Sequence, residues 1–189
     1  MAAPRESLPV LLRPCFAQDL QSVQFIYAHH VWHGTASFEL EPPSLEEMRL
    51  RWTNIVAANL PFLVAFPKTD PTRVVGYAYA AQFHPRPAYA HTFEDSVYVA
   101  PGAAGRGVGT ALLCGLLSQL QHPTAIRQVV ALIGDSANTA SIALHKKTLF
   151  QQVGMLRKVG RKFGRDVDVV LMQRSIASGA KNTGSDSVS

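Results

Sequence analysis

A glycine-rich turn near the middle of the chain has the residue types that bind anions. Gly105, Gly107 and Gly109 follow the apolar segment SVYVAP and precede the apolar run ALL. Glycine leaves the backbone amides open to a ligand, and the N-terminus of a following helix carries partial positive charge. The pattern predicts a strand, a turn and a helix that together hold an anion such as pyrophosphate.

Two familiar phosphate-binding loops do not match this turn. Gly102 and Gly107 have Walker A spacing, but Val108 stands where that loop places the lysine that reaches the terminal phosphates. A dinucleotide fingerprint reads GxGxxG, whereas this turn reads GxGxG. Nucleotide hydrolysis and dinucleotide binding are therefore disfavoured, and simple capping of the helix stays open as the plainest role of the glycines.

Two side chains that can move protons lie before and after the glycine turn. Glu94 lies near the start of the preceding strand, where partial burial would raise the pKa of its carboxyl toward the range of a general base. His145 titrates near neutral pH and can donate a proton or hold a water. Each also has a simpler interpretation, as a surface glutamate or a structural histidine. Asp95 should point to the opposite face of a regular strand, so we expect only one of the two carboxylates to serve the site.

Hydrophobic periodicity predicts the elements that position these groups. Ser44 followed by Glu47 is a capping-box pattern, which marks the start of one helix. Expected strands cover residues 9–13, 62–66, 74–81, 92–99, 129–133, 151–160 and 167–174. Expected helices cover residues 17–31, 45–55, the segment after the glycine turn, and 138–147. The order is βααβββαβαββ, which indicates an α/β fold with a mixed central sheet.

Length and composition favour one folded domain. The chain has 189 residues, of which 47% are hydrophobic and 16% charged, an ordinary globular balance. We expect the domain to cover residues 8–175, with flexible termini at 1–7 and 176–189. The N-terminus lacks a signal-peptide pattern, no apolar run approaches the roughly 20 residues of a membrane span, and two cysteines make no disulfide framework. The default expectation is a cytoplasmic protein with no membrane partner.

The net charge of +5 is partly clustered near the C-terminal end. Five basic residues fall within nine positions: Arg157, Lys158, Arg161, Lys162 and Arg165. Such a cluster is a solvated face, or it meets nucleic acid, a polyanionic cofactor or an acidic substrate. His29, His30 and His33 also cluster, but no cysteine or acidic partner completes a metal-site pattern, so no metal is expected.

Several motifs, taken together, resemble one family. The turn AGRGVG fits the acyl-CoA loop [QR]-x-x-G-x-[GA] of the GCN5-related N-acetyltransferases at all but its first position. With TFEDSVYVAP, FHPRPAY, SFELEPPSLEEM, KFGR, and Asn138 followed by ASIALH after one threonine, the chain resembles the branch that acetylates phosphinothricin, methionine sulfoximine and methionine sulfone. The resemblance runs from about Leu11 to Arg174. It implies acetyl-CoA as donor, a free amino group as acceptor, and a homodimer.

The resemblance also implies roles for residues at the donor end. It makes Glu94 the general base for the amine and His145 the acid that protonates the departing thiolate. The strand is expected to splay where the pantetheine arm inserts, with the backbone of Val97, Tyr98 and Val99 near the thioester carbonyl. The expected pyrophosphate and pantetheine contacts are Ala104, Gly105, Arg106, Gly107, Val108, Gly109 and Asn138.

At the acceptor end, the resemblance implies a pocket for an anionic group. Arg86 is expected to grip the acceptor's anionic oxygens in a fork. Tyr89 and Phe38 are expected to form walls of the pocket, and Lys162 to add a second charge, as part of the same chain or from the partner of a dimer.

Four positions depart from the family pattern, and one of them is Ala28, which replaces a frequent asparagine. Ala104 replaces glutamine or arginine at the first position of the loop, which removes one side-chain contact. Leu149 replaces a glycine, so we expect a somewhat different turn after the preceding helix. Asp166 replaces a tryptophan that borders the acceptor region in relatives, which bears on substrate preference.

The sequence therefore favours an N-acetyltransferase that moves acetyl from acetyl-CoA to a small amino-acid-like acceptor. Attack is expected to be direct, because no nucleophile for a covalent intermediate is evident. Another amine, such as a polyamine or a protein N-terminus, stays open as acceptor. The alternative of a different class is a basic binding module for nucleic acid on an inert fold, against which Glu94 and the glycine turn argue.

Overall fold

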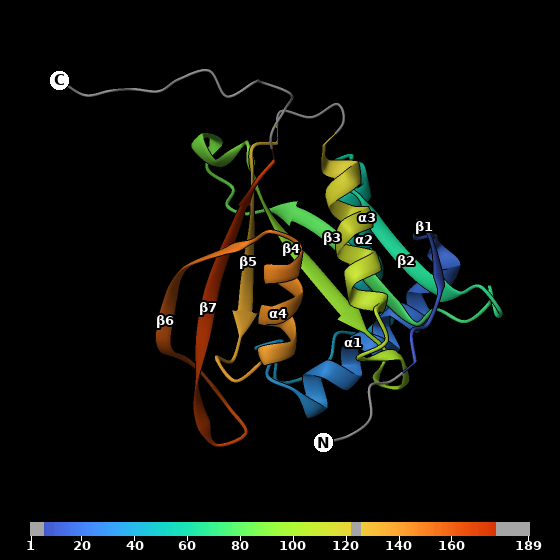
Figure 1. Cartoon of the computed structure of the whole chain (residues 1–189), viewed down its shortest axis with the longest axis horizontal. Coiled ribbons are helices and arrows are strands. Elements are labelled where there is room, and N and C mark those ends of the chain that lie inside the picture. Colours follow the sequence, from blue (N-terminus) through green and yellow to red (C-terminus); the bar gives the residue numbers. More distant parts are fainter. Residues whose placement is uncertain (1–5, 122–125, 177–189) are drawn as a thin grey trace.

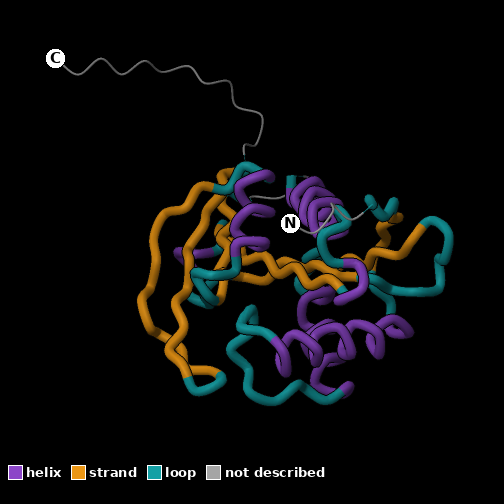
Figure 2. The backbone as a smooth tube through the Cα atoms, turned by 60° about the horizontal axis from the view of Figure 1, so that its bottom comes forward, coloured by secondary structure: helices purple, strands orange, loops and turns teal. Residues whose placement is uncertain are grey.

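The computed structural model describes residues 6–121 and 126–176, which form a seven-stranded sheet with helices on both faces (Figures 1 and 2). The strands lie in the order β1-β2-β3-β4-β5-β7-β6. Their bounds are β1 Val10–Pro14, β2 Phe62–Pro67, β3 Gly76–Gln82, β4 Thr92–Val99, β5 Gln128–Gly134, β6 Gln151–Lys162 and β7 Arg165–Ser175. The helices are α1 Leu20–His33, α2 Leu45–Ala57, α3 Val108–Leu120 and α4 Thr139–Lys147. Helices and strands thus follow the predicted order, and the mixed α/β fold is confirmed.

The ordered domain extends slightly beyond the expected boundaries. Ile176 is buried, and its amide donates to the carbonyl of Arg127 at 2.8 Å. At the other end, the carbonyl of Glu6 accepts a hydrogen bond from Arg106 Nε at 3.0 Å. The flexibility expected of residues 1–7 and 176–189 stays a prediction, and residues 1–5 and 177–189 lie outside the described part of the chain.

Two apolar clusters hold the helices to opposite faces of the sheet. On one face, α3 buries a row of leucines that includes Leu112 and Leu116 against β1, β2, β3 and β4. On the other face, α1 buries residues such as Leu20 and Val23 against Tyr77 of β3. Because side chains alternate along a strand, β3 serves both clusters at once. The sheet is thus fixed in the middle, between two apolar layers.

β4 and β5 separate after only three paired positions. β4 stays antiparallel to β3 from Phe93 to Val99. It pairs in parallel with β5 only from Thr92 to Glu94, although β5 continues along β7 as far as Gly134. Figure 1 shows the two strands diverging toward the N-terminus of α3. The splay expected from the family resemblance is therefore present, and it opens the sheet directly after Glu94.

The turn after α4 contains Leu149, which stands where the family resemblance implies a glycine. Leu149 adopts the left-handed backbone conformation that glycine favours, with φ of 68°. Its side chain is 72% exposed, so little packing opposes this conformation. The turn thus keeps a glycine-like path with a leucine in it, at the cost of backbone strain.

Candidate active site

A cavity of about 680 Å³ lies between the glycine turn, the end of β4 and α4. Eight of the ten residues predicted to bind the cofactor line it: Val97, Tyr98, Val99, Ala104, Gly105, Gly107, Gly109 and Asn138. We refer to it as the donor cavity.

Arg106 and Val108 belong to the same turn, but they are not among the residues that line the donor cavity. Val108, the first residue of α3, is 1% exposed and packs in the core between this helix and the sheet. The Nε of Arg106 donates to Glu6, and its own carbonyl accepts from the amide of Leu8 at 3.0 Å. The Arg106 side chain thus binds the N-terminal segment. Arg106 and Val108 can therefore contribute only backbone groups to an anion-binding site in this turn.

The backbone of the glycine turn explains its composition. Gly105 and Gly107 have φ of 72° and 86°, in the left-handed region that most side chains disfavour. Gly107 is the N-cap of α3 and has no side chain to occupy the helix end. The first amides of α3 are therefore free of side-chain capping by this residue and carry the positive end of the helix dipole. This geometry suits an anionic group such as a pyrophosphate.

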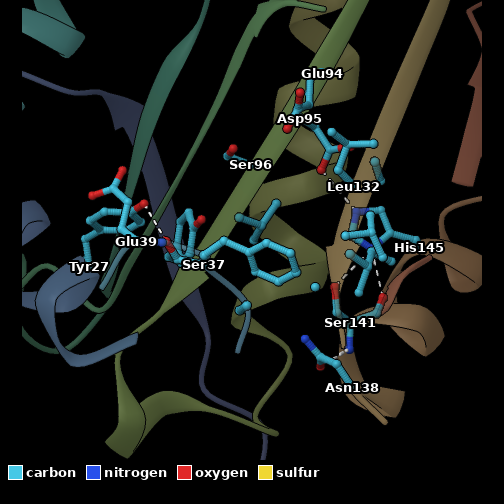
Figure 3. Close-up of a pocket in the computed structure, with 18 of the residues that line it drawn as sticks. Tyr27, Ser37, Glu39, Glu94, Asp95, Ser96, Leu132, Asn138, Ser141 and His145 are labelled. Atoms are coloured by element: carbon cyan, nitrogen blue, oxygen red, sulfur yellow. Dashed lines mark hydrogen bonds and ion pairs between the residues drawn. The ribbon is translucent and has the colours of Figure 1, made fainter. Parts of the chain in front are cut away.

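A second cavity, of about 540 Å³, lies in the opening between β4 and β5 (Figure 3). It shares five lining residues with the donor cavity: Ala36, Val97, Tyr98, Asn138 and Ser141. The two cavities therefore adjoin at the splay, and we call the second one the reaction cavity. Glu94 and His145, the two residues predicted to move protons, both line it.

Glu94 has the electrostatic surroundings of a general base. Its backbone occupies the last position where β4 pairs with β5, and its side chain lines the reaction cavity. Burial, with a smaller contribution from the neighbouring charge of Asp95, raises the pKa of the Glu94 carboxyl to about 7. A carboxyl with this pKa is about half ionised near neutral pH. The ionised fraction can accept a proton from the ammonium group of an acceptor.

Asp95 is also among the residues that line the reaction cavity, but its side chain lies on the opposite face of the sheet from that of Glu94, as strand alternation predicts. The Oδ2 of Asp95 lies 3.1 Å from Nε2 of His145, and both side chains are at most 5% exposed. Nδ1 of the same ring lies 2.8 Å from the carbonyl oxygen of Ser141. Burial lowers the pKa of His145, but its hydrogen bond with Asp95 and that residue's charge outweigh this effect and leave the pKa raised.

Asn138 does the capping that its position indicated. Its Oδ1 accepts from the amide of Ser141 at 3.2 Å, at the start of α4. Asn138 and Ser141 also line both cavities, so the first turn of α4 forms part of the boundary between them. The structural role and a cofactor contact are therefore compatible for Asn138.

The segment before α2 closes one side of the reaction cavity. Ser37, Phe38 and Glu39 line it. The predicted substrate contact Lys162 lies behind this wall, because its Nζ donates to the carbonyl of Ser37 at 2.7 Å and the residue is 3% exposed. Glu39 is ion-paired with Arg51 at 2.7 Å. Lys162 thus holds the wall in place, while Phe38 is part of the wall as predicted.

Arg86 and Tyr89 lie apart from both cavities of the described chain. They belong to the exposed loop between β3 and β4, where the Tyr89 ring packs 5.8 Å from the ring of Phe83. Neither is among the residues that line the two cavities. Asp166 lies at the β6–β7 hairpin, where it forms an exposed ion pair with Arg161 at 3.0 Å. A single copy of the chain therefore does not bring these predicted acceptor contacts together with Glu94.

Sequence reasoning did not single out Ser141, Glu39 or Lys147 as site residues, although they line the cavities. One signal for Ser141 was available, because Ser141 and His145 are four residues apart and so lie on one helix face. Lys147 lines the donor cavity from the end of α4. No comparable pattern marks Glu39, which reaches the site through the irregular segment before α2.

The described residues contain neither a cluster of metal ligands nor a membrane-spanning helix. Among residues 6–121 and 126–176, no group of three or more His, Cys, Asp or Glu side chains is arranged to hold a metal ion. Within the same ranges, every helix is too short or too polar to cross a lipid bilayer.

Comparison with known proteins agrees with this geometry. Residues 25–149 match the model of the acetyltransferase (GNAT) family. The chain is 50% identical over 161 residues to a phosphinothricin N-acetyltransferase of Alcaligenes faecalis, covering 85% of this chain and 80% of that one. It is 32% identical to the L-methionine sulfoximine/L-methionine sulfone acetyltransferase of Pseudomonas aeruginosa, covering 87% and 94%. A Sinorhizobium meliloti phosphinothricin acetyltransferase crystallised with acetyl-CoA superposes with a TM-score of 0.85 at 38% identity, covering 95% of both chains. The chain therefore belongs to the acetyltransferase (GNAT) family.

Proposed function

We propose that this protein transfers an acetyl group from acetyl-CoA to the amino group of a small amino-acid-like acceptor. The observation that carries the proposal is the position of Glu94, whose carboxyl has a pKa of about 7 and lines the cavity that adjoins the donor cavity. Acetyl transfer to an amine requires a neutral nucleophile, and this carboxylate supplies the base that makes it neutral. The phosphinothricin and methionine sulfoximine acetyltransferases named above give the acceptor class its support.

The donor cavity fits the parts of acetyl-CoA in a definite order. The pyrophosphate would rest on the amides of the turn from Ala104 to Gly109, at the N-terminus of α3. The pantetheine arm would follow the free edge of β4 between Val97 and Val99, where β5 no longer pairs with it. The thioester would then lie at the junction of the two cavities, beside Tyr98 and Ser141. The extended arm thus points the acetyl group toward Glu94.

The reaction itself needs no covalent intermediate. Glu94 would take a proton from the acceptor's ammonium, directly or through a water, and the free amine would attack the thioester carbon. Backbone amides of the splayed segment from Val97 to Val99 are placed to stabilise the oxyanion of the tetrahedral intermediate. Its collapse forms the amide bond and breaks the carbon–sulfur bond, which leaves a CoA thiolate that must gain a proton.

We propose a homodimer because an anionic group of the acceptor needs a basic partner that one copy of the chain does not supply to the reaction cavity. The described lining of the reaction cavity contains the carboxylates of Glu39, Glu94 and Asp95 and lacks a lysine or arginine. An arginine that grips an anionic acceptor must then come from outside this lining, and we propose Arg86 and Tyr89 of a second copy. Exposed apolar residues beside the cavity offer a surface for that copy: Leu132, Leu156, Val159 and Phe163. We place the protein in the cytoplasm, which agrees with the free thiols of Cys15 and Cys114.

A thiol-release assay with acetyl-CoA tests the proposal. The acceptor panel is phosphinothricin, methionine sulfoximine, methionine sulfone, a polyamine and a peptide with a free N-terminus. We expect CoA release with the first three and an Arg86→Ala variant with a raised KM for them. Release only with the polyamine or the peptide would overturn the acceptor class. Absence of release with all five, from a protein that binds acetyl-CoA, would overturn the transferase itself.

A further inference from the structure

Three polar side chains form a continuous chain from β4 to the junction of the two cavities. Asp95 Oδ2 lies 3.1 Å from His145 Nε2, and His145 Nδ1 lies 3.4 Å from Ser141 Oγ (Figure 3). Asp95 and His145 are buried, whereas Ser141 is half-buried and lines both cavities. The chain therefore begins in the protein interior and ends where the thioester of a bound donor would lie.

The hydrogen-bond acceptors show in which direction protons are donated along these three side chains. A carbonyl oxygen can only accept, so the 2.8 Å contact of Nδ1 with the Ser141 carbonyl requires a proton on Nδ1. The Asp95 carboxylate, when ionised, likewise requires a proton on Nε2. The ring is then an imidazolium that donates at both nitrogens. Because Nδ1 carries a proton, Ser141 Oγ accepts from the ring and keeps its own hydroxyl proton for another acceptor.

This direction separates the arrangement from a nucleophilic serine triad. In such a triad, a histidine nitrogen without a proton accepts the hydroxyl proton of serine and so activates the oxygen for attack. Here the ring nitrogen that faces Ser141 Oγ is the one already committed as a donor to the Ser141 carbonyl. The serine is therefore arranged to give a proton to the cavity, and an acyl-serine intermediate has no base to form it.

We propose that Asp95, His145 and Ser141 deliver the proton that the departing CoA thiolate needs. The inference rests on the proposed acetyl transfer. As the carbon–sulfur bond breaks, sulfur takes the hydroxyl proton of Ser141, and Ser141 Oγ takes the Nδ1 proton of His145. The ring is left neutral, with its remaining proton on Nε2 and donated to Asp95, and water returns a proton to Nδ1 after CoA leaves. Ser141 is the catalytic residue of this chain, and Asp95 is a positioning residue that acts through His145.

The charges around His145 set the pH range of such a relay. Asp95 faces it from β4, Glu94 precedes Asp95 on the opposite face of that strand and lines the same cavity, and Lys146 and Lys147 follow it on α4. From β7, Arg174 donates to the Thr148 carbonyl at 2.6 Å, just beyond the histidine. The relay works while His145 is protonated, and Glu94 works while it is ionised. The pH–rate profile should therefore be bell-shaped, and removal of the Asp95 charge should move its alkaline limb to lower pH.

The first test compares Ser141→Ala and Asp95→Asn with the exposed control Ser118→Ala. With acetyl-CoA, we expect kcat to fall about 100-fold in the two site variants, the usual scale for loss of a general acid, while the control keeps wild-type activity. With the acetyl thioester of an aryl thiol, whose thiolate leaves without protonation, the same variants should fall less than about threefold in kcat/KM. Equal losses with both donors, or wild-type kcat and pH profile in both site variants, would overturn the relay.

The second test reads the ring directly and does not depend on turnover. Nitrogen-15 NMR of the histidine rings, with His145 assigned from a His145→Gln variant, should show protons on both nitrogens at neutral pH. Asp95→Asn, or Asp95→Ser if the asparagine variant does not fold, should show a neutral ring under the same conditions. A neutral His145 in the wild type would overturn the relay. If the ring is an imidazolium but no amine is acetylated, the proposed transferase function fails while the direction of the chain stands.

Discussion

Glu94 and Asp95 are consecutive residues of β4, and both are among the residues that line the reaction cavity. The pairing of β4 with β5 ends at Glu94, so the cavity opens at the edge of the strand between these two residues. Asp95 is satisfied on one oxygen by His145, whereas Glu94 has no such partner to keep it ionised. The raised pKa of Glu94 and the raised pKa of His145 thus arise from two adjacent carboxyls with different partners, an arrangement that suits a site with a base and an acid.

Replacement of Glu94 by glutamine should remove the base without changing the shape of the cavity. We expect kcat to fall by about 100-fold or more at neutral pH, because a general base contributes on that scale. In the wild type, kcat/KM should rise with pH as the carboxyl ionises through a pKa of about 7, and this rise should be absent from Glu94→Gln. Initial rates across pH and calorimetric binding of acetyl-CoA check both points. Near-wild-type turnover with unchanged donor affinity would contradict the assignment.

The same substitution should affect stability in the opposite sense. The folded state raises the pKa of Glu94 from 4.5 to about 7, so it binds this proton more tightly than the unfolded chain does. The stabilising contribution of Glu94 is therefore complete below pH 4.5 and is lost as the pH rises through about 7. Relative to the wild type, Glu94→Gln should gain up to about 3 kcal/mol between acidic and mildly alkaline pH, which denaturant unfolding at the two pH values measures. A pH-independent difference would contradict it.

Local patterns were sufficient to predict the helices and strands and the glycine turn before α3. The capping box at Ser44 starts α2, where the Ser44 hydroxyl accepts from the Glu47 amide at 3.1 Å. The spacing of Gly105 and Gly107 marks a left-handed turn before α3. These features depend on residues a few positions apart, so their physical cause is contained in the sequence itself.

Contacts between distant segments were not predictable in this way. Asp95 meets His145 across 50 residues, and Lys162 meets the Ser37 carbonyl across 125. Strict alternation of side chains predicted the opposite faces of Glu94 and Asp95, but not that both residues line the opening between β4 and β5. Lys162 was assigned to the substrate from the family resemblance, and only the packed structure shows that its amine donates to a backbone carbonyl.

Gly107→Ala should weaken acetyl-CoA binding through the backbone. The residue has φ of 86°, and an alanine there costs about 1–2 kcal/mol, which favours a rearranged turn with misplaced amides. We expect the Kd of acetyl-CoA to rise about tenfold, by calorimetry. Gly102→Ala is the matched control in the same loop, since an added Cβ at that position meets no atom within 4 Å. Equal affinities for the two variants would remove the turn from the donor site.

Lys162→Met should loosen the wall of the reaction cavity without touching the donor cavity. It leaves the buried Ser37 carbonyl without the amine that now donates to it at 2.7 Å, a loss of about 1–3 kcal/mol. We expect a lower melting temperature, a raised KM for the acceptor and an unchanged Kd for acetyl-CoA. Lys158→Met, at an exposed lysine of the same strand, is the control and should resemble the wild type. A variant whose acceptor KM and stability both match the control would show that Lys162 does not support the wall.

Leu149→Gly should stabilise the protein, although it removes a large apolar side chain. Leu149 is 72% exposed and holds φ of 68°, so the lost packing is small and the relieved backbone strain is about 1 kcal/mol. Leu149→Ala keeps a Cβ and therefore the strain, so it should not gain stability. Urea unfolding of the three proteins at one pH separates the two effects. If glycine and alanine change the free energy of unfolding equally, side-chain packing at this turn outweighs the backbone, and the left-handed leucine carries no cost.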